Sequence, residues 1–196
     1  MLSAARWDHQ ALPAWRMQKA QSLHFEADRR LSVAVWLLLK RLLAERGFDA
    51  DSLPVRIDAS GKPAFTGDAA PHFSLSHSDE MVMAAISSSP VGCDIERIPR
   101  LQPGLAEECL SSEELASLPA ARWGHRALPV TRAHAFCRLW TRKESYLKAL
   151  GCGLSANLRE ITVLSPTLPP NWRIEDCAAP AGYCAAVCRQ AAVTPR

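Results

Sequence analysis

Val91-Gly92-Cys93-Asp94-Ile95-Glu96 is a short run of mainly apolar residues that carries two carboxylates. Its pattern predicts a β-strand, preceded by the turn Ser88-Ser89-Pro90. In a strand, residues two positions apart point to the same face, so Asp94 and Glu96 are expected to lie side by side. The segment therefore predicts a strand that presents a pair of acidic groups to one surface.

A second acidic motif, Trp140-Thr141-Arg142-Lys143-Glu144-Ser145-Tyr146-Leu147-Lys148, follows further along the chain. If this segment is helical, Glu144 and Lys148 are neighbours on one face. A convergence of Asp94, Glu96 and Glu144 forms a site of hard oxygen ligands that suits Mg²⁺, an ion that proteins commonly bind together with substrate phosphates. The lysine one turn from Glu144 indicates that phosphate is part of the substrate.

Outward from these motifs, the chain alternates between helix-like and strand-like patterns. Gly47 and Gly151 are expected to end helices, and Ser111 or Ser112 to begin one before Glu113 and Glu114. The predicted helices cover 14–23, 26–46, 107–118 and about 131 or 133 to 150, and the predicted strands cover 55–58, 73–77, 82–87, 91–96, 158–164, 172–175 and 183–189. Helices followed by antiparallel strands, twice over, indicate an α+β fold.

This repeated order predicts two lobes, an N-terminal lobe over residues 1–98 and a C-terminal lobe over residues 99–196. The proline-containing segment Ile98–Pro103 is the expected linker between them. The repeat is one of element order and not of sequence identity. A length of 196 residues permits either one domain or two small lobes.

Composition limits the class of protein. The net charge of +3 is too small to indicate a nucleic-acid-binding protein, and 48% hydrophobic residues are enough for a core. Met1–Gln10 contains Arg6 and Asp8 in place of an apolar run, and Val33–Leu43 is too short to span a bilayer. A cytoplasmic protein that binds neither membrane nor nucleic acid is therefore expected.

The seven cysteines all lie at or after Cys93, and no two of them form a CxxC pair. An odd number without secretory features argues against a disulfide framework. Cys177, Cys184 and Cys188 lack the paired spacing of a zinc site, so buried free thiols are expected.

Three blocks in this order resemble the surfactin-synthetase-type 4′-phosphopantetheinyl transferases. They are Gly61-Lys62-Pro63-Ala64-Phe65 followed by Phe73-Ser74-Leu75-Ser76-His77-Ser78, then 91–96, then the Trp-x-x-Lys-Glu-x-x-x-Lys core within 136–150. The resemblance spans residues from about 60 to 155. It implies a pseudo-dimer of two similar α+β lobes with the active site at their interface. It also implies a monomeric enzyme that moves the phosphopantetheine of coenzyme A to a serine of a carrier protein.

The resemblance also implies roles for single residues. Asp94, Glu96 and Glu144 would hold Mg²⁺, and Glu144 would take the serine proton directly or through water. Coenzyme A would be bound by Arg29, Ser60, Gly61, Lys62, Pro63, Ser76, His77 and Lys148, with His77 and Lys148 at the reacting pyrophosphate. Arg16 and Lys19 are further basic residues that could stand in for the family's clamp on the 3′-phosphate of coenzyme A, and the resemblance does not align them.

The implied partner is an acidic acyl or peptidyl carrier protein of fatty acid, polyketide or nonribosomal peptide synthesis. Arg138, Arg142 and Lys143, on the helix that carries Glu144, are expected to attract it. An apolar edge near Leu110 and Leu115 is the alternative docking surface.

Two other functions are compatible with parts of the sequence. A catalytically inactive carrier-binding or coenzyme-A-binding module would keep the fold, but retention of all three carboxylates argues against it. A basic nucleic-acid-binding protein needs a charged stripe, and pairs such as Arg29-Arg30 and Lys40-Arg41 are too short to form one.

Overall fold

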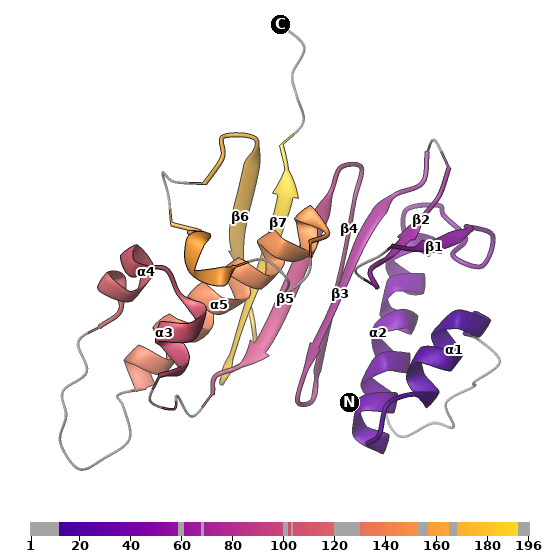
Figure 1. Cartoon of the computed structure of the whole chain (residues 1–196). Coiled ribbons are helices and arrows are strands. Elements are labelled where there is room, and N and C mark those ends of the chain that lie inside the picture. Colours follow the sequence, from indigo (N-terminus) through magenta and orange to yellow (C-terminus); the bar gives the residue numbers. More distant parts are fainter. Residues whose placement is uncertain are drawn as a thin grey trace, which may run out of the picture.

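The computed structural model describes residues 12–58, 61–67, 69–99, 102, 104–119, 130–152, 157–164 and 168–191. The N-terminal elements are α1 (Ala14–Gln21), α2 (Glu26–Ala44), β1 (Val55–Ile57), β2 (Pro63–Phe65), β3 (His72–Ser78) and β4 (Met81–Ser87). The C-terminal elements are β5 (Val91–Arg97), α3 (Leu105–Cys109), α4 (Ser112–Ser117), α5 (Val130–Leu150), the 3₁₀ turn η3 (Leu158–Glu160), β6 (Trp172–Cys177) and β7 (Tyr183–Gln190). Figure 1 shows the first group on the right and the helices and outer strands of the second on the left.

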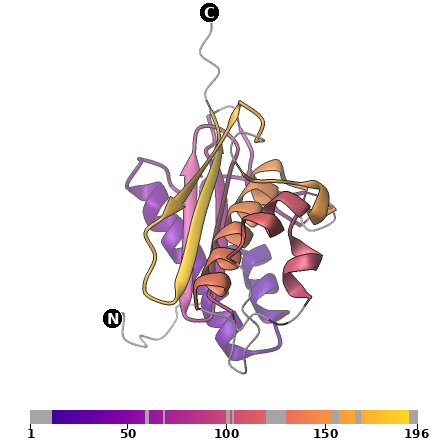
Figure 2. The same cartoon turned by 90° about the vertical axis from the view of Figure 1, so that its left-hand side faces the viewer.

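The strands form three small antiparallel sheets, ordered β1-β2, β3-β4 and β5-β7-β6. β3 lies beside β5, so the second and third sheets meet in the middle of the molecule (Figure 1). α2 packs on β3 and β4, and α5 packs on β5 and β7. Figure 2 shows α3, α4 and α5 together on one side of the C-terminal strands.

α2 is an amphipathic helix that covers the N-terminal core. Its buried residues Val35, Leu39 and Leu43 recur at intervals of four, which places them on one face. Trp36, only 1% exposed, packs edge-on against Phe73. The helix ends at Ala44, and Gly47, with a φ of +80°, closes the turn that follows it, a conformation that costs glycine little. The predicted stop is therefore confirmed.

α5 lies directly on the backbone of β5, and this contact requires a residue without a side chain at position 92. A Cβ atom added to Gly92 would lie 1.9 Å from the carbonyl oxygen of Ser145 and 2.5 Å from the nitrogen of Ala149. Because both are backbone atoms, no rotamer change could relieve the overlap. The glycine therefore sets how closely Glu144 and Lys148 approach the strand that carries Asp94.

A fully buried ion pair joins α5 to α4. Lys143 and Glu114 are both 0% exposed, and their charged atoms lie 2.6 Å apart. Lys143 Nζ also donates to the carbonyls of Cys109 and Leu158. Glu114 also accepts from the backbone N–H groups of Ser111 and Val163, and its bond from Ser111 belongs to a capping box. Every charge in this network is therefore neutralised and hydrogen-bonded, as burial demands.

Replacing Lys143 by Met is expected to lower the free energy of unfolding by about 3–5 kcal/mol, because it leaves the buried Glu114 charge unpaired. The double variant Lys143→Met/Glu114→Gln is expected to lose less, since no charge remains. Chemical denaturation of both variants tests this. A single variant as stable as the double would show that the pair is not what holds α4 on α5.

The mixed α and β composition predicted from the sequence is confirmed, and so are most element positions. The helix expected over 107–118 is wrong, since it divides into α3 and α4 at Leu110 and Ser111. The strand expected over 158–164 is wrong as well, since η3 begins the segment and Thr162 and Val163 are in irregular structure. β2 was not predicted. The division into two lobes stays a prediction, and part of the expected linker lies outside the described residues.

Two further expectations concern cysteines and membranes. The seven cysteines are present as thiols, and five of them, including Cys93, are buried. In the described part of the chain, no helix combines the length and the apolarity needed to cross a bilayer.

Candidate active site

Asp94 lies on β5 at the centre of the candidate site and is 2% exposed. Its Oδ1 accepts hydrogen bonds from Ser76 Oγ at 2.7 Å and from Lys148 Nζ at 2.6 Å. Lys148 reaches it from α5, so three elements converge on a single carboxylate oxygen. Asp94 Oδ2 is also buried, and within the described part of the chain it has no hydrogen-bond partner. An unpartnered carboxylate oxygen at such depth is costly unless a cation or proton satisfies it.

Glu96 follows two residues later on β5 and is half-buried. Its Oε2 accepts a hydrogen bond of 2.6 Å from Ser78 Oγ. Burial raises the pKa of Glu96, the hydrogen bond from Ser78 lowers it, and the charge of Asp94 raises it further. The two carboxylates are therefore close enough to repel each other, as their spacing in a strand predicted.

Glu144 presents its carboxylate from α5, with Oε1 buried and unpartnered. Burial raises the pKa of Glu144 from 4.5 to about 7, Lys148 opposes this rise, and Asp94 and Glu96 add to it. The negative charges of both β5 carboxylates therefore act on Glu144. A carboxyl group with a pKa near neutrality is suited to accept a proton during a reaction.

The fit of these residues to a divalent cation follows from their oxygens. Within the described ranges, no three His, Cys, Asp or Glu side chains are placed so as to surround one ion. The Lys148 ammonium supplies the positive charge next to Asp94. Asp94 Oδ2 and Glu144 Oε1 nevertheless remain as two buried hard oxygens without partners, which is the ligand type that Mg²⁺ prefers. The chemical type of these two oxygens therefore fits the ion, and the three-carboxylate site stays a prediction.

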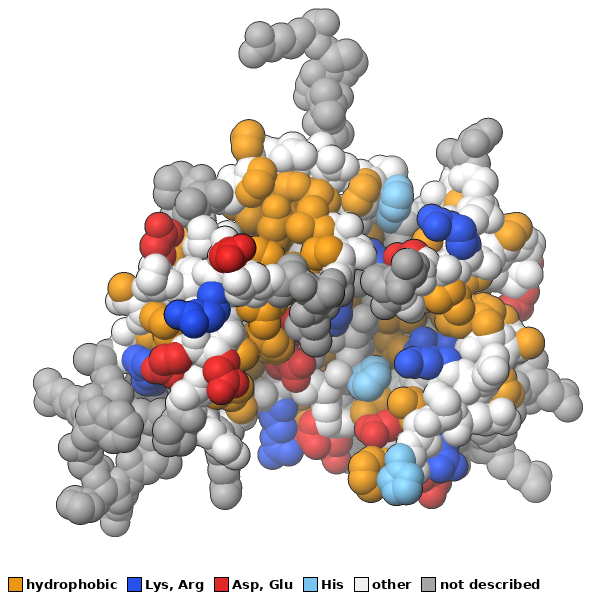
Figure 3. Space-filling view, in the orientation of Figure 1, with side chains coloured by type: hydrophobic (Ala, Val, Ile, Leu, Met, Phe, Trp, Pro, Cys, Tyr) orange, Lys and Arg blue, Asp and Glu red, His pale blue; other side chains and the backbone are white. Residues whose placement is uncertain are grey.

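A cavity of about 290 Å³ adjoins Lys148. Its lining includes four basic side chains, from Arg16, Lys62, His77 and Lys148, together with Gly61 and Pro63. In Figure 3, charged and histidine side chains gather over the lower middle of the face, near the ends of β3 and β5. A hollow with this lining is suited to a ligand that carries several phosphates.

Lys62 connects this cavity to the end of α5. Its Nζ donates to the carbonyl of Lys148 and, at 3.4 Å, to that of Val91. A lysine that bonds the last carbonyls of a helix complements its partial negative charge. Burial lowers the pKa of Lys62. Gly61, with a φ of +82°, precedes Lys62 in the turn predicted from the sequence.

Arg16, which the sequence offered only as a possible clamp on the 3′-phosphate, lines this cavity. It lies on α1, is 8% exposed, and donates from Nη2 and Nε to the carbonyl of Ser32 at 2.8 and 3.3 Å. Burial lowers the pKa of Arg16 to about 10, so it remains charged at neutral pH. The only signal in the sequence was a charged residue between the apolar residues Trp15 and Met17 of a predicted helix.

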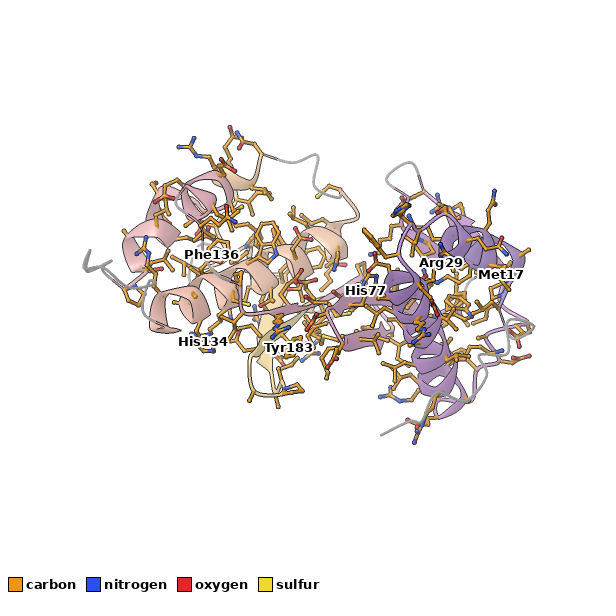
Figure 4. The ribbon with its side chains drawn as sticks, turned by 90° about the horizontal axis from the view of Figure 1, so that it is seen from below. Met17, Arg29, His77, His134, Phe136 and Tyr183 are labelled. Carbon is orange, nitrogen blue, oxygen red and sulfur yellow. The ribbon has the colours of Figure 1, made fainter. Side chains whose placement is uncertain are left out.

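His77 and Arg29 lie apart. His77 lies near the end of β3, and its side chain is exposed on one side and lines the cavity on the other. The partial burial of its ring, followed by the charge of Arg16, lowers its pKa. Figure 4 shows it between α2 and the C-terminal strands. Arg29 lines a different hollow with Met17 and donates to the carbonyls of Leu23 and His24. The structure therefore does not bring Arg29 into the cavity that contains Lys62 and His77, and Ser60 lies outside the described residues.

The basic surface expected on α5 needs correction. Lys143 is fully buried and cannot attract a partner. Arg138 and Arg142 both pair with Asp176 of β6, at 2.5 and 3.2 Å, and they lower the pKa of its carboxyl group although burial opposes them. The sequence pattern could not show this, because Asp176 is distant in the chain.

Known proteins resemble this chain over most of its length. The family model described as "4'-phosphopantetheinyl transferase superfamily" matches residues 90–188, half of the chain. The chain is 36% identical over 118 residues to the 4′-phosphopantetheinyl transferase gsp of Aneurinibacillus migulanus, covering 60% of this chain and 46% of gsp. Two further relatives are psf-1 of Bacillus pumilus (30% over 164 residues, 82% of this chain, 67% of psf-1) and Sfp of Bacillus subtilis strain 168 (29% over 150 residues, 76% and 64%).

The matched region thus spans between about half and two thirds of each of these three relatives. The predicted resemblance to Sfp-like enzymes is confirmed. A family match over half of the chain, together with 30% identity to psf-1 over most of it, shows that this chain belongs to the 4′-phosphopantetheinyl transferase superfamily.

Proposed function

We propose that the protein transfers 4′-phosphopantetheine from coenzyme A to a serine hydroxyl of an apo carrier protein. The observation that carries this is the position of Lys148, which contacts Asp94 and also lines the basic cavity. A pyrophosphate held in the cavity would therefore lie next to the carboxylates. The related proteins of this name support the same reaction. The site lies where β3 and β5 meet, which supports the expected arrangement of two lobes around an active site.

In this reaction the serine oxygen attacks the phosphorus on the pantetheine side of the pyrophosphate. A new oxygen–phosphorus bond forms as the bond to adenosine 3′,5′-bisphosphate breaks. Glu144 accepts the hydroxyl proton directly or through water, which its raised pKa favours. Arg16, Lys62, His77 and Lys148 bind and orient the phosphates, and His77 and Lys148 also neutralise the charge that develops on the leaving group.

Asp94, Glu96 and Glu144 would hold Mg²⁺ in this proposal. When bound, the ion would act as a Lewis acid toward phosphate oxygens. Ser76 and Ser78 donate hydrogen bonds to the two carboxylates of β5.

The proposed function is tested by incubating the protein with coenzyme A, Mg²⁺ and a panel of apo acyl and peptidyl carrier proteins. Intact-mass measurement should show one added phosphopantetheine group on at least one carrier, and release of adenosine 3′,5′-bisphosphate in equal amount. A protein that binds coenzyme A and carriers without either product would instead be a binding module. The partner's acidity, the monomeric state and the cytoplasmic location remain predictions.

Replacing Glu144 by Gln is expected to abolish transfer and to stabilise the metal-free protein at pH 8. The folded pKa of Glu144 is about 7 against 4.5 for an unperturbed group, so between these values the folded state binds more protons than the unfolded state. Stability from Glu144 is therefore present at low pH and lost as pH rises from about 4.5 to 7. Gln does not ionise. Thermal unfolding is measured with chelator at pH 5 and pH 8. The difference in unfolding temperature between Glu144→Gln and the wild type should be larger at pH 8, whereas an equal difference at both pH values would refute the raised pKa.

Replacing Arg16 by Met is expected to raise the Michaelis constant for coenzyme A about tenfold or more with less effect on turnover. A hydrogen bond to a charged group contributes roughly 1.5–3 kcal/mol, and a phosphate that does not react is bound equally in ground and transition states. Arg29→Met is the matched variant, since Arg29 lines a different hollow. If only Arg29→Met raises the constant, the role suggested by the family resemblance is right and Arg16 is structural. Dephospho-coenzyme A shows whether the lost contact was to the 3′-phosphate.

A further inference from the structure

β3 and β5 lie side by side, and serine side chains of β3 hydrogen-bond to the backbone of β5. The hydroxyl oxygens of Ser74, Ser76 and Ser78 accept hydrogen bonds from the backbone N–H groups of residues 93, 95 and 97, at 3.0, 3.3 and 3.1 Å. The separation along the chain is 19 residues in each case. The two strands therefore run in the same direction in fixed register. We call these three contacts the serine ladder.

The serine ladder occupies strand edges that have no strand partner. β3 pairs with β4 and β5 pairs with β7, and the two pairs belong to separate sheets. The outward N–H groups of β5 would otherwise be unpaired at depth, since Cys93 and Ile95 are buried. Phe73 and Leu75 alternate with the serines and belong to the core beneath α2. The alternating residues of 73–78 therefore contact two different surfaces: the serines bond β5, and the apolar residues pack in the core beneath α2.

Two members of the serine ladder do more than pair an amide. A hydroxyl is one donor and two acceptors, so a serine can accept from the backbone and still donate. Ser76 donates to Asp94 at 2.7 Å, and Ser78 donates to Glu96 at 2.6 Å. Ser74 accepts from the Cys93 amide and, among the described residues, has no hydrogen bond to a carboxylate. Ser76 also contacts Lys148, whereas Ser78 serves Glu96 and the Arg97 amide alone among the described contacts.

The turn after Ser78 is tied to the C-terminal strands as well. Asp79 adopts a φ of 52° and pairs with Arg97 of β5 at 2.5 Å. Tyr183 Oη of β7 donates to Asp79 at 3.2 Å and accepts from the Glu80 amide at 3.4 Å. Ser78 is therefore fixed by contacts on both sides, those of the serine ladder, which it ends, and those that Asp79 and Glu80 make with β5 and β7. A hydroxyl held in this way can fix the direction of the carboxylate it binds.

We propose that Ser78 is a positioning residue that orients Glu96 for binding a divalent cation, while the serine ladder sets the register of β3 against β5. This inference rests on the proposed function, since it concerns the metal site assumed there. Groups that hydrogen-bond to metal ligands orient them, and their loss commonly weakens metal affinity by about 10–100-fold. Ser78 should act on the cation through Glu96 and should not affect coenzyme A binding.

The test measures Mn²⁺ binding by the full chain, from the electron paramagnetic resonance signal of free Mn²⁺. Ser78→Ala is expected to weaken binding about tenfold or more, and Ser78→Thr, which keeps the hydroxyl, to restore most of it. Ser74→Ala is the matched control, because it removes the same kind of amide contact without touching a carboxylate, and its Mn²⁺ affinity should equal that of the wild type. Hydrogen exchange should quicken at the Arg97 amide in the first variant and at the Cys93 amide in the control.

The outcomes separate the two proposals. Wild-type Mn²⁺ affinity in Ser78→Ala, with the wild type itself binding, overturns the role of Ser78 and leaves the proposed function standing. No Mn²⁺ binding by the wild type overturns the metal site and with it the role of Ser78, whereas the mass measurement on carrier proteins decides the proposed transfer separately. Equal weakening in Ser74→Ala and Ser78→Ala would show that the serine ladder acts only on the fold. If Ser78→Ala does not fold, Ser78→Cys, with its weaker donor, should bind Mn²⁺ less tightly than Ser78→Thr. Equal binding by these two would also overturn the proposal. In transfer assays the folded variant should need more Mg²⁺ for half-maximal rate at an unchanged Michaelis constant for coenzyme A.

Discussion

Replacing Asp94 by Asn should lower the rate of phosphopantetheine transfer by about a thousandfold or more. A Lewis-acidic cation contributes several kcal/mol to the transition state, and each 1.36 kcal/mol corresponds to tenfold in rate. The substitution keeps the shape of the side chain but removes the charge that Lys148 and Ser76 contact. Release of adenosine 3′,5′-bisphosphate measures the loss, and circular dichroism shows whether the fold is retained.

The matched control is Glu175→Gln on β6. Glu175 is also a strand carboxylate paired with an arginine, Arg189 at 3.1 Å. It is 65% exposed, and its ion pair involves no residue of the candidate site. Its loss should leave transfer close to the wild-type rate, as is usual for exposed pairs. Turnover near normal in Asp94→Asn would remove the carboxylate site from the mechanism.

Replacing Gly92 by Ala should lower the free energy of unfolding by about 3 kcal/mol or more, above the usual range for overpacking, because the new methyl group meets backbone. α5 would have to move away from β5 to clear the 1.9 Å approach to the Ser145 carbonyl. That movement would carry Glu144 and Lys148 away from Asp94, so transfer should fall even where the protein still folds. Chemical denaturation and steady-state kinetics together measure both effects.

Gly182→Ala provides the comparison for this prediction. Gly182 has a φ of +87° with no atom within 4 Å of an added Cβ, so its substitution tests backbone strain alone. Such strain costs about 1–2 kcal/mol. If Gly92→Ala is no more destabilising than Gly182→Ala, then α5 does not rest on the backbone of β5 as the structure indicates.

Local patterns predicted the elements with clear periodicity. α2 repeats its apolar residues over nineteen residues and is followed by Gly47. β3 alternates apolar and polar residues, and β4 and β5 are mainly apolar runs bounded by short turns. The patterns failed where tertiary contacts overrode propensity. The segment after η3 reads as a strand, but its Val163 amide bonds Glu114 from another helix instead of a strand neighbour. The short β2 was hidden because Pro63 begins it beside a turn.

The candidate site shows the same division. Asp94 and Glu96 share a face because a strand has a period of two, and Glu144 and Lys148 share one because a helix turn brings residues four apart together. The structure then brings these pairs together. Lys143, in the same motif, looked like a surface cation and is buried against Glu114. Sequence spacing alone cannot show that Lys143 pairs with a buried carboxylate 29 residues away in the chain.

The sequence by itself determined the family, the two acidic motifs and the α+β order, because each depends on residues close together in the chain. Only the tertiary structure decided that Arg16 lines the cavity, that Arg29 does not, and that serines of β3 bond both the amides and the carboxylates of β5. These contacts depend on the distance at which two strands and two helices pack. That distance is set by side-chain volumes across the whole core, including the missing side chain of Gly92.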